Sequence, residues 1–303
     1  MDGNSALAQR GMFAFICFAW GTTWLAMKVG IAVVPPGLFA GLRWTVAGTI
    51  LLLILWLRGE RVWPPLRLVP RLAFVSVLLI TLNQVIQLYG LKYVTAGLAA
   101  VISSALTPIA LLGFAVAFGQ ERFTKRQIGA LALGMIGVCT LFGPAAIAGT
   151  LHLSEVGGAL GVTIGCLCYT AGSVMTLPMM RSFAPVQLSG LTDLIGGLVL
   201  LFASLLFEPG AWEAMSFHWG WAPFLAWLYL LIPGSLISTT MYFLLVRDWG
   251  ASKPGLYAFI SPVIAVTIGA SLFGELLDWG DAVGMTLMLA AAGLALRRPR
   301  VAR

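Results

Sequence analysis

The stretch Ser103-Ser104-Ala105-Leu106-Thr107-Pro108 lies in a long apolar segment that ends at Gly119-Gln120-Glu121, and the pattern returns later in the chain. The second copy, Tyr257-Ala258-Phe259-Ile260-Ser261-Pro262, runs on to Phe273-Gly274-Glu275. Pro108 and Pro262 are 154 residues apart, and so are Glu121 and Glu275. An apolar helix with a central proline and a terminal acid, present twice at one offset, indicates a duplicated protein.

The composition places this duplicated chain in a lipid bilayer. Its 303 residues are 60% hydrophobic and 10% charged, with a mean hydropathy of +0.96. A soluble domain carries about 25% charged residues, so this chain has too little polar surface to cover a water-soluble globule. The net charge of +7 is assigned to basic residues that set membrane topology, and no nucleic-acid partner is expected.

Apolar runs of the roughly 20 residues that cross a bilayer occur ten times. The runs are joined by short connections, so successive helices are expected to be antiparallel neighbours. The first run has no small-residue cleavage site and is interpreted as a retained span. We therefore predict an all-α membrane protein with ten transmembrane helices, at 11–34, 37–57, 71–91, 95–118, 125–143, 156–180, 186–207, 220–246, 254–274 and 281–296.

Basic and acidic residues gather in alternate connections between these spans. With the N-terminus inside, the inner segments hold 15 of the 18 lysines and arginines. The outer segments hold most of the acids, among them Glu155, Glu208 and Glu213. Because basic residues are retained on the cytoplasmic side, both termini are predicted to be cytoplasmic.

The ten spans divide into two halves of five, at 11–143 and 156–296. Trp20 corresponds to Tyr169, and Pro36 to Pro185, at an offset of 149. An odd number of helices per half means that the second half is inverted relative to the first. Inverted repeats are typical of secondary carriers, whose substrate site lies near the midplane between the repeats.

The first half carries distinctive motifs at Tyr89-Gly90-Leu91-Lys92-Tyr93-Val94-Thr95-Ala96, Thr107-Pro108, Gly119-Gln120-Glu121-Arg122-Phe123-Thr124 and Gln127-Ile128-Gly129. With these motifs, the repeat and the topology, the chain resembles the drug/metabolite transporter superfamily in its ten-helix EamA-type branch. The second half fits more loosely, since Leu276 stands where the family often has arginine. The resemblance implies a multi-pass protein of the bacterial inner membrane that exports small metabolites, and it looks closest to exporters of aromatic and other neutral amino acids.

Polar and aromatic residues near the middle of the spans are the candidate substrate contacts, because hydrogen-bonding groups that face lipid are costly. Trp20, Thr23 and Trp24 share one face of the first span, where packing between helices is the alternative role. For the amides of the third span the alternative is hydrogen bonding between helices. The further candidates are Asn83, Gln84, Gln87, Ser103, Thr107, Tyr169, Ser173, Thr240, Tyr257 and Ser261.

The two prolines are candidate hinges. Each removes a backbone donor and should expose carbonyls one turn back, around Ser104 for Pro108 and near Ala258 for Pro262. Because proline kinks in spanning helices are often only a matter of shape, both roles stay open at this point.

Four charged residues inside or at the end of spans need partners. Arg43 and Asp193 are placed at opposite depths and are not expected to pair, so Glu275 is the predicted partner of Arg43. Asp193 is interpreted as one half of an ion pair near the cytoplasmic side, with a proton relay as the alternative. Glu121 is expected to be solvated or to snorkel, with a structural role and no contact with substrate, and the role of Lys28 is left open.

The sequence shows no pattern for metal, cofactor or catalysis. The four cysteines lie in apolar runs and are interpreted as buried thiols, and Cys166 and Cys168 point to opposite sides of a helix. His152 and His218 have no partner at metal-ligand spacing. No glycine fingerprint for nucleotides precedes a helix. We expect no metal, no cofactor and no enzymatic activity.

The favoured function is secondary transport by alternating access, through a cavity between the first, third, fourth, sixth, eighth and ninth spans. Export down a substrate gradient is the first choice, and exchange for protons the second. A multidrug exporter and a membrane-embedded enzyme that modifies lipids are the alternatives. The expected partners are an amino-acid-like substrate and the lipid bilayer. The protein is expected to be a monomer, since a fused duplicate needs no second copy.

Overall fold

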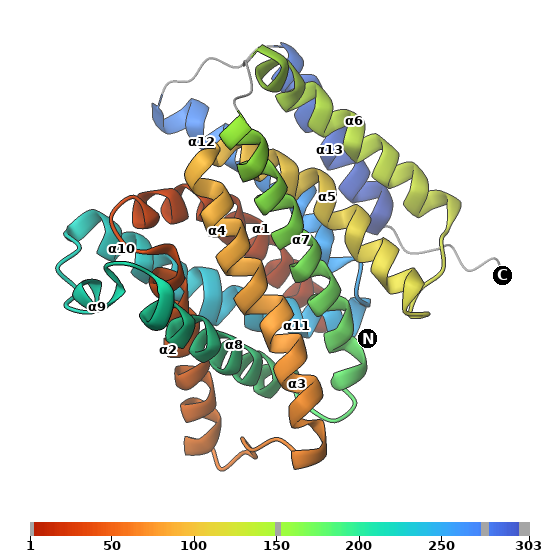
Figure 1. Ribbon diagram of the computed structural model, residues 1–303. Helices are drawn as coiled ribbons and strands as arrows, with labels where there is room; N and C mark the ends of the chain where they lie inside the picture. Colours follow the sequence, from red (N-terminus) through yellow and green to blue (C-terminus); the bar gives the residue numbers. More distant parts are fainter. Residues whose placement is uncertain (1–2, 149–152, 274–278, 297–303) are drawn as a thin grey trace.

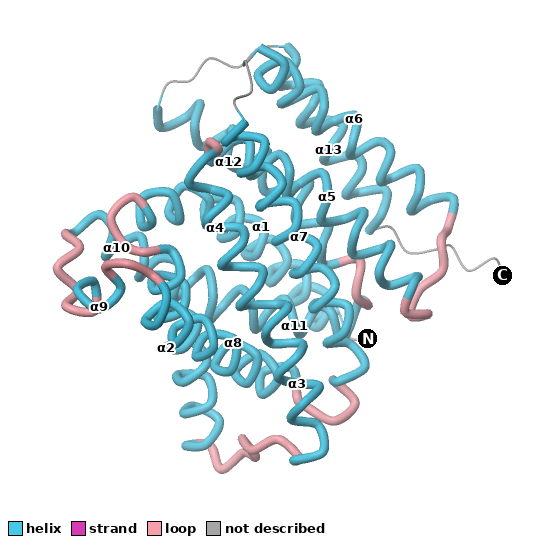
Figure 2. Tube along the Cα trace, viewed as in Figure 1, coloured by secondary structure: helices cyan, strands magenta, loops and turns pink. Residues whose placement is uncertain are grey.

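The computed structural model describes residues 3–148, 153–273 and 279–296, and these form helices joined by short connections, with no strand (Figures 1 and 2). The all-α prediction is thus confirmed for this part of the chain. The elements are α1 (Gly3–Ile31), α2 (Pro36–Leu57), η1 (Leu66–Leu68), α3 (Val69–Ser76), η2 (Val77–Leu82), α4 (Asn83–Tyr93), α5 (Ala96–Ala117), α6 (Lys125–Ala148), α7 (Leu153–Met179), α8 (Pro185–Phe207), α9 (Ala211–Ala214), α10 (Trp221–Tyr229), η3 (Leu230–Ile237), α11 (Ser238–Trp249), η4 (Pro254–Leu256), α12 (Tyr257–Phe273) and α13 (Trp279–Leu296).

Seven helical segments of the described chain are long and apolar enough to cross a membrane. The other three predicted spans coincide with α6, α12 and α13, so the count of ten stays a prediction. The seven segments are Ala6–Ile31, Pro36–Leu57, Leu66–Tyr93, Leu98–Ala117, Leu153–Met179, Pro185–Phe207 and Trp221–Trp249.

Two of these segments contain a π-helix that the sequence did not predict. The third predicted span is built as α3, η2 and α4, and the eighth as α10, η3 and α11, where η2 and η3 are π-helices. They start 153 residues apart, at Val77 and Leu230, and end 155 apart, at Leu82 and Ile237. A π-turn changes which side chains face the bundle interior, and such turns are frequent at functional sites.

The helices pair in a pattern that survives exchange of the two halves. α2 packs against α8, and α6 lies beside α13 (Figure 1). α4 and α5 both contact α7, whereas α12 and the segment α10–α11 both contact α1. α1 and α7 are the first helices of the two halves. If each helix is replaced by its counterpart in the other half, the contacts of α7 become those of α1, and the α2–α8 and α6–α13 contacts stay the same.

Close approach of α2 and α8 depends on glycine. A Cβ atom at Gly48 would lie 2.3 Å from the backbone nitrogen of Leu194, and one at Gly197 would lie 2.4 Å from that of Thr45. Real Cβ atoms do not approach backbone atoms so closely, so only glycine fits at either position. Small residues at such crossings are typical of membrane helix pairs.

The connections gather at two ends of the bundle. Loop 58–65 lies at the bottom of Figure 1, and loops 118–124 and 180–184 lie toward the lower right, on the side of the N-terminus. Loops 32–35 and 208–220 lie at the left of the view. We call the first set the basic end, since its loops carry Arg58, Arg61, Arg122 and Arg181, and the second set the opposite end.

Side-chain contacts close the opposite end between helices of both halves. The carboxylate of Glu208, where α8 ends, accepts hydrogen bonds from the backbone nitrogens of Gly37 and Leu38, each at 3.1 Å. It also accepts a 2.7 Å bond from the hydroxyl of Tyr89. These amides are free donors at the start of α2, and an acid is stabilising there. Glu208 thereby joins α8, α2 and α4.

Lys28, whose role the sequence left open, also acts at the opposite end. Its ammonium donates to the carbonyl oxygens of Leu91 at 2.6 Å and Val94 at 2.7 Å. These carbonyls lie in the last turn of α4 and at the residue that caps it, where a cation is favourable. Lys28 therefore ties the end of α1 to the end of α4.

The basic end has its own contacts between the halves. Gln9 of α1 donates to Asp248 at 2.9 Å, and its amide oxygen accepts from the indole of Trp249 at 3.0 Å. Glu121 accepts from the backbone nitrogen of Ser252 at 3.0 Å and from its hydroxyl at 2.6 Å. The structural role expected for Glu121 agrees with these contacts, although its carboxylate is held by donors from the connection after α11 and is not freely solvated.

Candidate functional site

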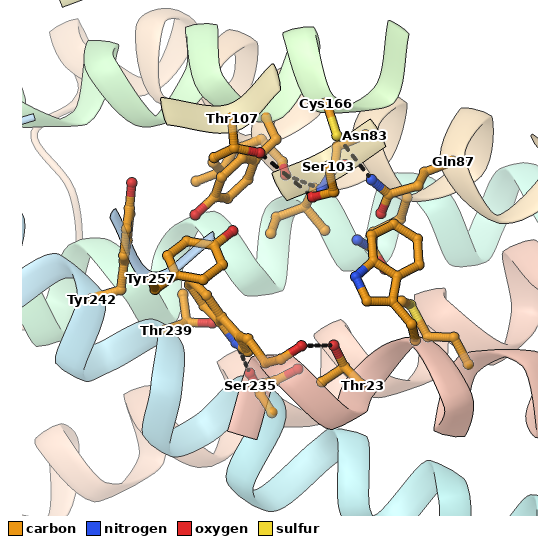
Figure 3. Close-up of a pocket in the computed structure, with 18 of the residues that line it drawn as sticks. Thr23, Asn83, Gln87, Ser103, Thr107, Cys166, Ser235, Thr239, Tyr242 and Tyr257 are labelled. Atoms are coloured by element: carbon orange, nitrogen blue, oxygen red, sulfur yellow. Dashed lines mark hydrogen bonds between the residues drawn. The ribbon is translucent and has the colours of Figure 1, made fainter. Parts of the chain in front are cut away.

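A cavity lies at the centre of the bundle, where six of the predicted spans meet. It holds about 940 Å³ of empty space, including the part that is open to solvent. Figure 3 shows its labelled polar side chains converging from α1, α4, α5, α7, η3, α11 and α12. These elements are the first, third, fourth, sixth, eighth and ninth predicted spans, the same set that the sequence placed around a central cavity. The second span, α2, adds Arg43 and Trp44 to the wall.

Most of the predicted site residues face this cavity. Eleven of the thirteen line it, and they come from both halves of the chain. Their role in binding stays a prediction. The eleven are Trp20, Thr23, Trp24, Asn83, Gln84, Gln87, Ser103, Thr107, Tyr169, Tyr257 and Ser261.

One side of the cavity is formed by four aromatic rings, which we call the aromatic cluster: Trp20, Tyr169, Tyr242 and Tyr257. The centroid of the Trp20 ring lies 4.6 Å from that of Tyr257, 5.3 Å from that of Tyr242 and 6.4 Å from that of Tyr169. Rings at these separations attract one another and form a stiff wall. The cluster is therefore a preformed and largely apolar surface.

The indole of Trp20 is fixed by the π-helix of the second half. Its N–H donates to the carbonyl oxygen of Gly234 at 2.9 Å. Gly234 lies in η3, where the π-turn and Pro233 leave carbonyls without their usual donors. Ser238 uses another of them, donating to Pro233 at 2.6 Å. The bond from Trp20 thus joins the first span of one half to the third span of the other.

The three amides of α4 have different partners. The Asn83 amide nitrogen donates to Leu79 of its own helix at 3.1 Å. Gln84 accepts a 2.7 Å hydrogen bond from a guanidinium nitrogen of Arg43. Gln87 lies 3.6 Å from the sulfur of Cys166. Only the last two bonds join helices, so hydrogen bonding between helices explains part of this group.

Hydroxyl groups supply further polar surface near the prolines. Ser103 and Thr107 lie 3.5 Å apart on α5, and Ser261 donates to the carbonyl oxygen of Cys17 at 2.9 Å. The residues one turn before each proline, Ser104 and Ala258, also line the cavity. The hinge role of Pro108 and Pro262 stays a prediction.

Two predicted site residues do not line the cavity. Ser173 is fully buried and lies within 2.7 Å hydrogen-bonding distance of the Tyr242 hydroxyl, so it positions a wall residue. Thr240 bonds back to Leu236 of its own segment at 2.8 Å. The π-turn of η3 changes the facing residues, and the eighth span presents Ser235, Thr239 and Tyr242 instead. No signal in the sequence placed that turn.

Arg43 is the charged residue that sequence reasoning left outside the site. Its side chain is 5% exposed, and its guanidinium lies 4.7 Å from the centroid of the Trp44 ring. The predicted partner Glu275 lies outside the described residues. The sequence did contain a signal for this position, because Arg43 lies well inside a predicted span. Charged residues within the membrane face the bundle interior or a cavity.

Asp193 is fully buried on α8 and does not line the cavity. Within the described residues it makes no ion pair, so the pair expected near the cytoplasmic side is not present there. Neither oxygen of its carboxyl group has a hydrogen-bond partner in the described chain. Arg43 and Asp193 are thus not a contact pair.

Metal ligands do not cluster in the described part of the chain, where no group of three or more His, Cys, Asp or Glu side chains is found. Cys17 and Cys166 are buried thiols, as predicted. Cys139 is exposed on α6, which corrects that prediction for this residue. An apolar run signals burial in lipid as well as in protein, and the sequence does not separate the two.

The chain matches a known protein family in both of its halves. The model of the EamA-like transporter family matches residues 10–143 and again residues 156–297. The chain belongs to the EamA-like transporter family. It is 31% identical to the uncharacterized inner membrane transporter YedA of Escherichia coli K12, over 92% of this chain and 87% of that protein. Membership in a transporter family sets aside the alternative of a lipid-modifying enzyme.

Other members of the EamA-like family are more distant. The uncharacterized transporter YvbV of Bacillus subtilis is 28% identical over 92% of this chain and 88% of its own length. Protein PagO of Salmonella typhimurium is 27% identical over 87% and 84%. A crystal structure of a protein 18% identical in sequence superposes with a TM-score of 0.77, covering 95% of this chain and 96% of that one. That last similarity shows the shared fold.

Proposed function

We propose that this EamA-family transporter exports small neutral metabolites, with aromatic and other neutral amino acids as its main substrates. The observation that carries the proposal is the composition of the central cavity. Four aromatic rings form one side, and amides, hydroxyls and one guanidinium supply hydrogen bonds elsewhere. Small-molecule sites combine apolar walls with a few placed polar groups, and an amino acid has both kinds of surface.

The transport cycle is alternating access between two inverted repeats, residues 11–143 and 156–296, with both termini cytoplasmic. Two observations support this proposal. The helix contacts survive exchange of the two halves, as inverted repeats require. Each end of the bundle is closed by its own polar contacts, Glu208 with α2 at one end and Glu121 with Ser252 at the other. Breaking one set leaves the other in place, which is what alternation needs.

Export is driven by the substrate gradient in this proposal. The cavity wall holds no carboxylate among its described residues, and the one deeply buried acid of the described spans, Asp193, lies away from it. Proton exchange is the second choice and would have to act through Asp193. The protein works as a monomer in the inner membrane, since one chain supplies both halves of the cavity.

Multidrug export is the competing substrate class, and one observation favours it. The aromatic cluster presents ring faces that attract lipophilic cations. Arg43 opposes this class, because a guanidinium in the same wall repels a cationic ligand.

The test is uptake by proteoliposomes that contain only the purified protein. Labelled phenylalanine, tryptophan, leucine, glycine and ethidium are supplied in turn, with and without a proton gradient. We expect phenylalanine and tryptophan to move fastest, at a rate that does not depend on the gradient. Uptake of ethidium alone would favour multidrug export, and failure to move any neutral amino acid would overturn the substrate proposal.

A further inference from the structure

Arg43 is the one charged side chain among the described residues that line the cavity. It lies on α2 within a predicted membrane span and is 5% exposed. A guanidinium does not lose its proton in proteins, and it has five N–H donors. A buried cation with unused donors in a membrane needs an acceptor, because burial of an unpaired charge is costly.

The contacts of this guanidinium leave most of its donors free. Nη2 donates to the amide oxygen of Gln84 at 2.7 Å. Nε is enclosed without a partner, and Nη1 has no hydrogen bond within the described chain. The ring of Trp44 covers one face at 4.7 Å. One neutral amide and one aromatic ring therefore hold the arginine in place without neutralising it.

No carboxylate of the described residues completes the pair. Asp193 makes no ion pair with Arg43, because the two side chains are not within 4 Å of each other. A guanidinium presents paired N–H groups in a plane, and a carboxylate accepts two of them at once. The missing partner therefore has the chemistry of a carboxylate that arrives through the cavity.

We propose that Arg43 and Gln84 form a carboxylate site, at which Arg43 binds the carboxylate of the transported molecule and Gln84 holds the guanidinium in position. The aromatic cluster then receives the side chain of that molecule. Figure 3 shows Tyr242 and Tyr257 across the cavity from Gln87, which is on the same helix as Gln84. This inference rests on the proposed function and narrows its substrates to carboxylates, of which a neutral amino acid is one.

The test compares three probes that share a phenyl ring. L-phenylalanine has both an amine and a carboxylate, 3-phenylpropionate has only the carboxylate, and phenethylamine has only the amine. Binding to the purified full-length protein is followed by tryptophan fluorescence, since Trp20, Trp24 and Trp44 line the cavity. The wild type is expected to bind the two carboxylates on the order of tenfold more tightly than phenethylamine, as for charge-assisted hydrogen bonds.

Two variants remove this preference by different routes. Arg43→Gln deletes the cation and should bring the three affinities within about twofold of one another. Gln84→Glu keeps the cation and places a carboxylate of the protein on it, so the variant should fold and should also lose the preference. Thr240→Ala is the matched control, because its hydroxyl bonds its own helix outside the cavity, and it should bind as the wild type does.

The outcomes separate this inference from the proposed function. If the wild type binds L-phenylalanine and folded Gln84→Glu keeps the full preference for carboxylates, the carboxylate site is wrong and the proposed function stands. If the wild type binds none of the three probes, the proposed function fails and the carboxylate site fails with it. If Arg43→Gln does not fold, Gln84→Glu alone decides.

Discussion

Gly48 of α2 lies directly against Leu194 of α8, so that a Cβ atom on the glycine would come within 2.3 Å of the leucine nitrogen. The reverse contact has Gly197 of α8 against Thr45 of α2, at 2.4 Å. Both pairs are related by an offset of 149, since 48 + 149 = 197 and 45 + 149 = 194. The crossing of α2 and α8 therefore contains two equivalent glycine contacts, one contributed by each half of the chain.

Replacing Gly48 with leucine should prevent this crossing. The added side chain would meet backbone atoms of α8, which cannot move aside as a flexible side chain does. Overpacking costs about 1–3 kcal/mol even where side chains yield, and the cost here should be higher. We expect a loss of most of the folded, monodisperse protein, measured by size-exclusion chromatography after extraction in mild detergent.

The matched control is Gly293→Leu on α13, where a Cβ atom would meet nothing within 4 Å. It adds the same side chain to a helix and should leave the chromatographic profile unchanged. Equal recovery of the two variants would contradict the packing that we describe for α2 and α8.

Trp20→Phe tests the bond between the indole and Gly234. The substitution keeps a ring in the aromatic cluster but removes the N–H that donates to the Gly234 carbonyl at 2.9 Å. A buried acceptor without its donor costs about 1–3 kcal/mol, so the melting temperature should fall by several degrees. Trp56→Phe, at a position 62% exposed, is the control and should have the same melting temperature as the wild type. Thermal unfolding monitored by dye binding measures both, and an unshifted Trp20→Phe would show that the bond is dispensable.

Glu208→Ala tests the closure of the opposite end. The change frees the nitrogens of Gly37 and Leu38 and the hydroxyl of Tyr89 at once. Loss of a helix cap costs about 0.5–2 kcal/mol, so a clear fall in thermal stability is expected. Glu213→Ala, in the same loop and exposed, is the control and should have no effect. The prediction is wrong if the two variants lose the same amount of stability.

Much of the fold could be predicted from the sequence, because membrane spans follow from composition alone. The ranges of α2, α5 and α8 agree with the runs of apolar residues, and Pro36 and Pro185 begin equivalent helices. The π-helices could not be predicted in the same way. Whether a turn takes an extra residue depends on packing by distant segments, such as the bond from Trp20 into η3.

The presence of a central cavity could be predicted from polar residues at mid-depth in the spans. The full set of residues that form its wall could not. Asn83 and Gln87 could be recognised because an amide side chain that faces lipid would lack hydrogen-bond partners. Arg43 was not included in the predicted site, because its partner was sought only among residues at the same depth in the membrane. Its long side chain instead reaches Gln84 on another helix. Thr240 was misplaced because the π-turn before it rotates the facing residues.

Glu121→Ala should open the basic end more often. The change removes both bonds to Ser252 and the 3.2 Å bond from Gln127. Cys166 lines the cavity and reports on access to it. In a variant whose other cysteines are replaced by alanine, its labelling by a membrane-impermeant maleimide from the basic end should accelerate several-fold, since each bond contributes about 1 kcal/mol.

The control for this opening is Glu60→Ala, an exposed residue of the loop after α2 at the same end. It also removes one negative charge but has no hydrogen bond to another helix. Equal labelling rates in the two variants would show that Glu121 does not hold the basic end closed.

Asp193→Asn separates export down a gradient from proton exchange. The carboxylate is fully buried, is absent from the cavity wall, and has no hydrogen bond of normal geometry to stabilise its charge. A group so enclosed has no evident path for protons, so phenylalanine transport should persist with the pH dependence of the wild type. Rates in proteoliposomes from pH 5.5 to 8.5 measure the effect, with Glu213→Gln as the control. A flat pH profile in Asp193→Asn alone, where the wild type is pH-dependent, would make Asp193 the proton relay and would replace downhill export with exchange.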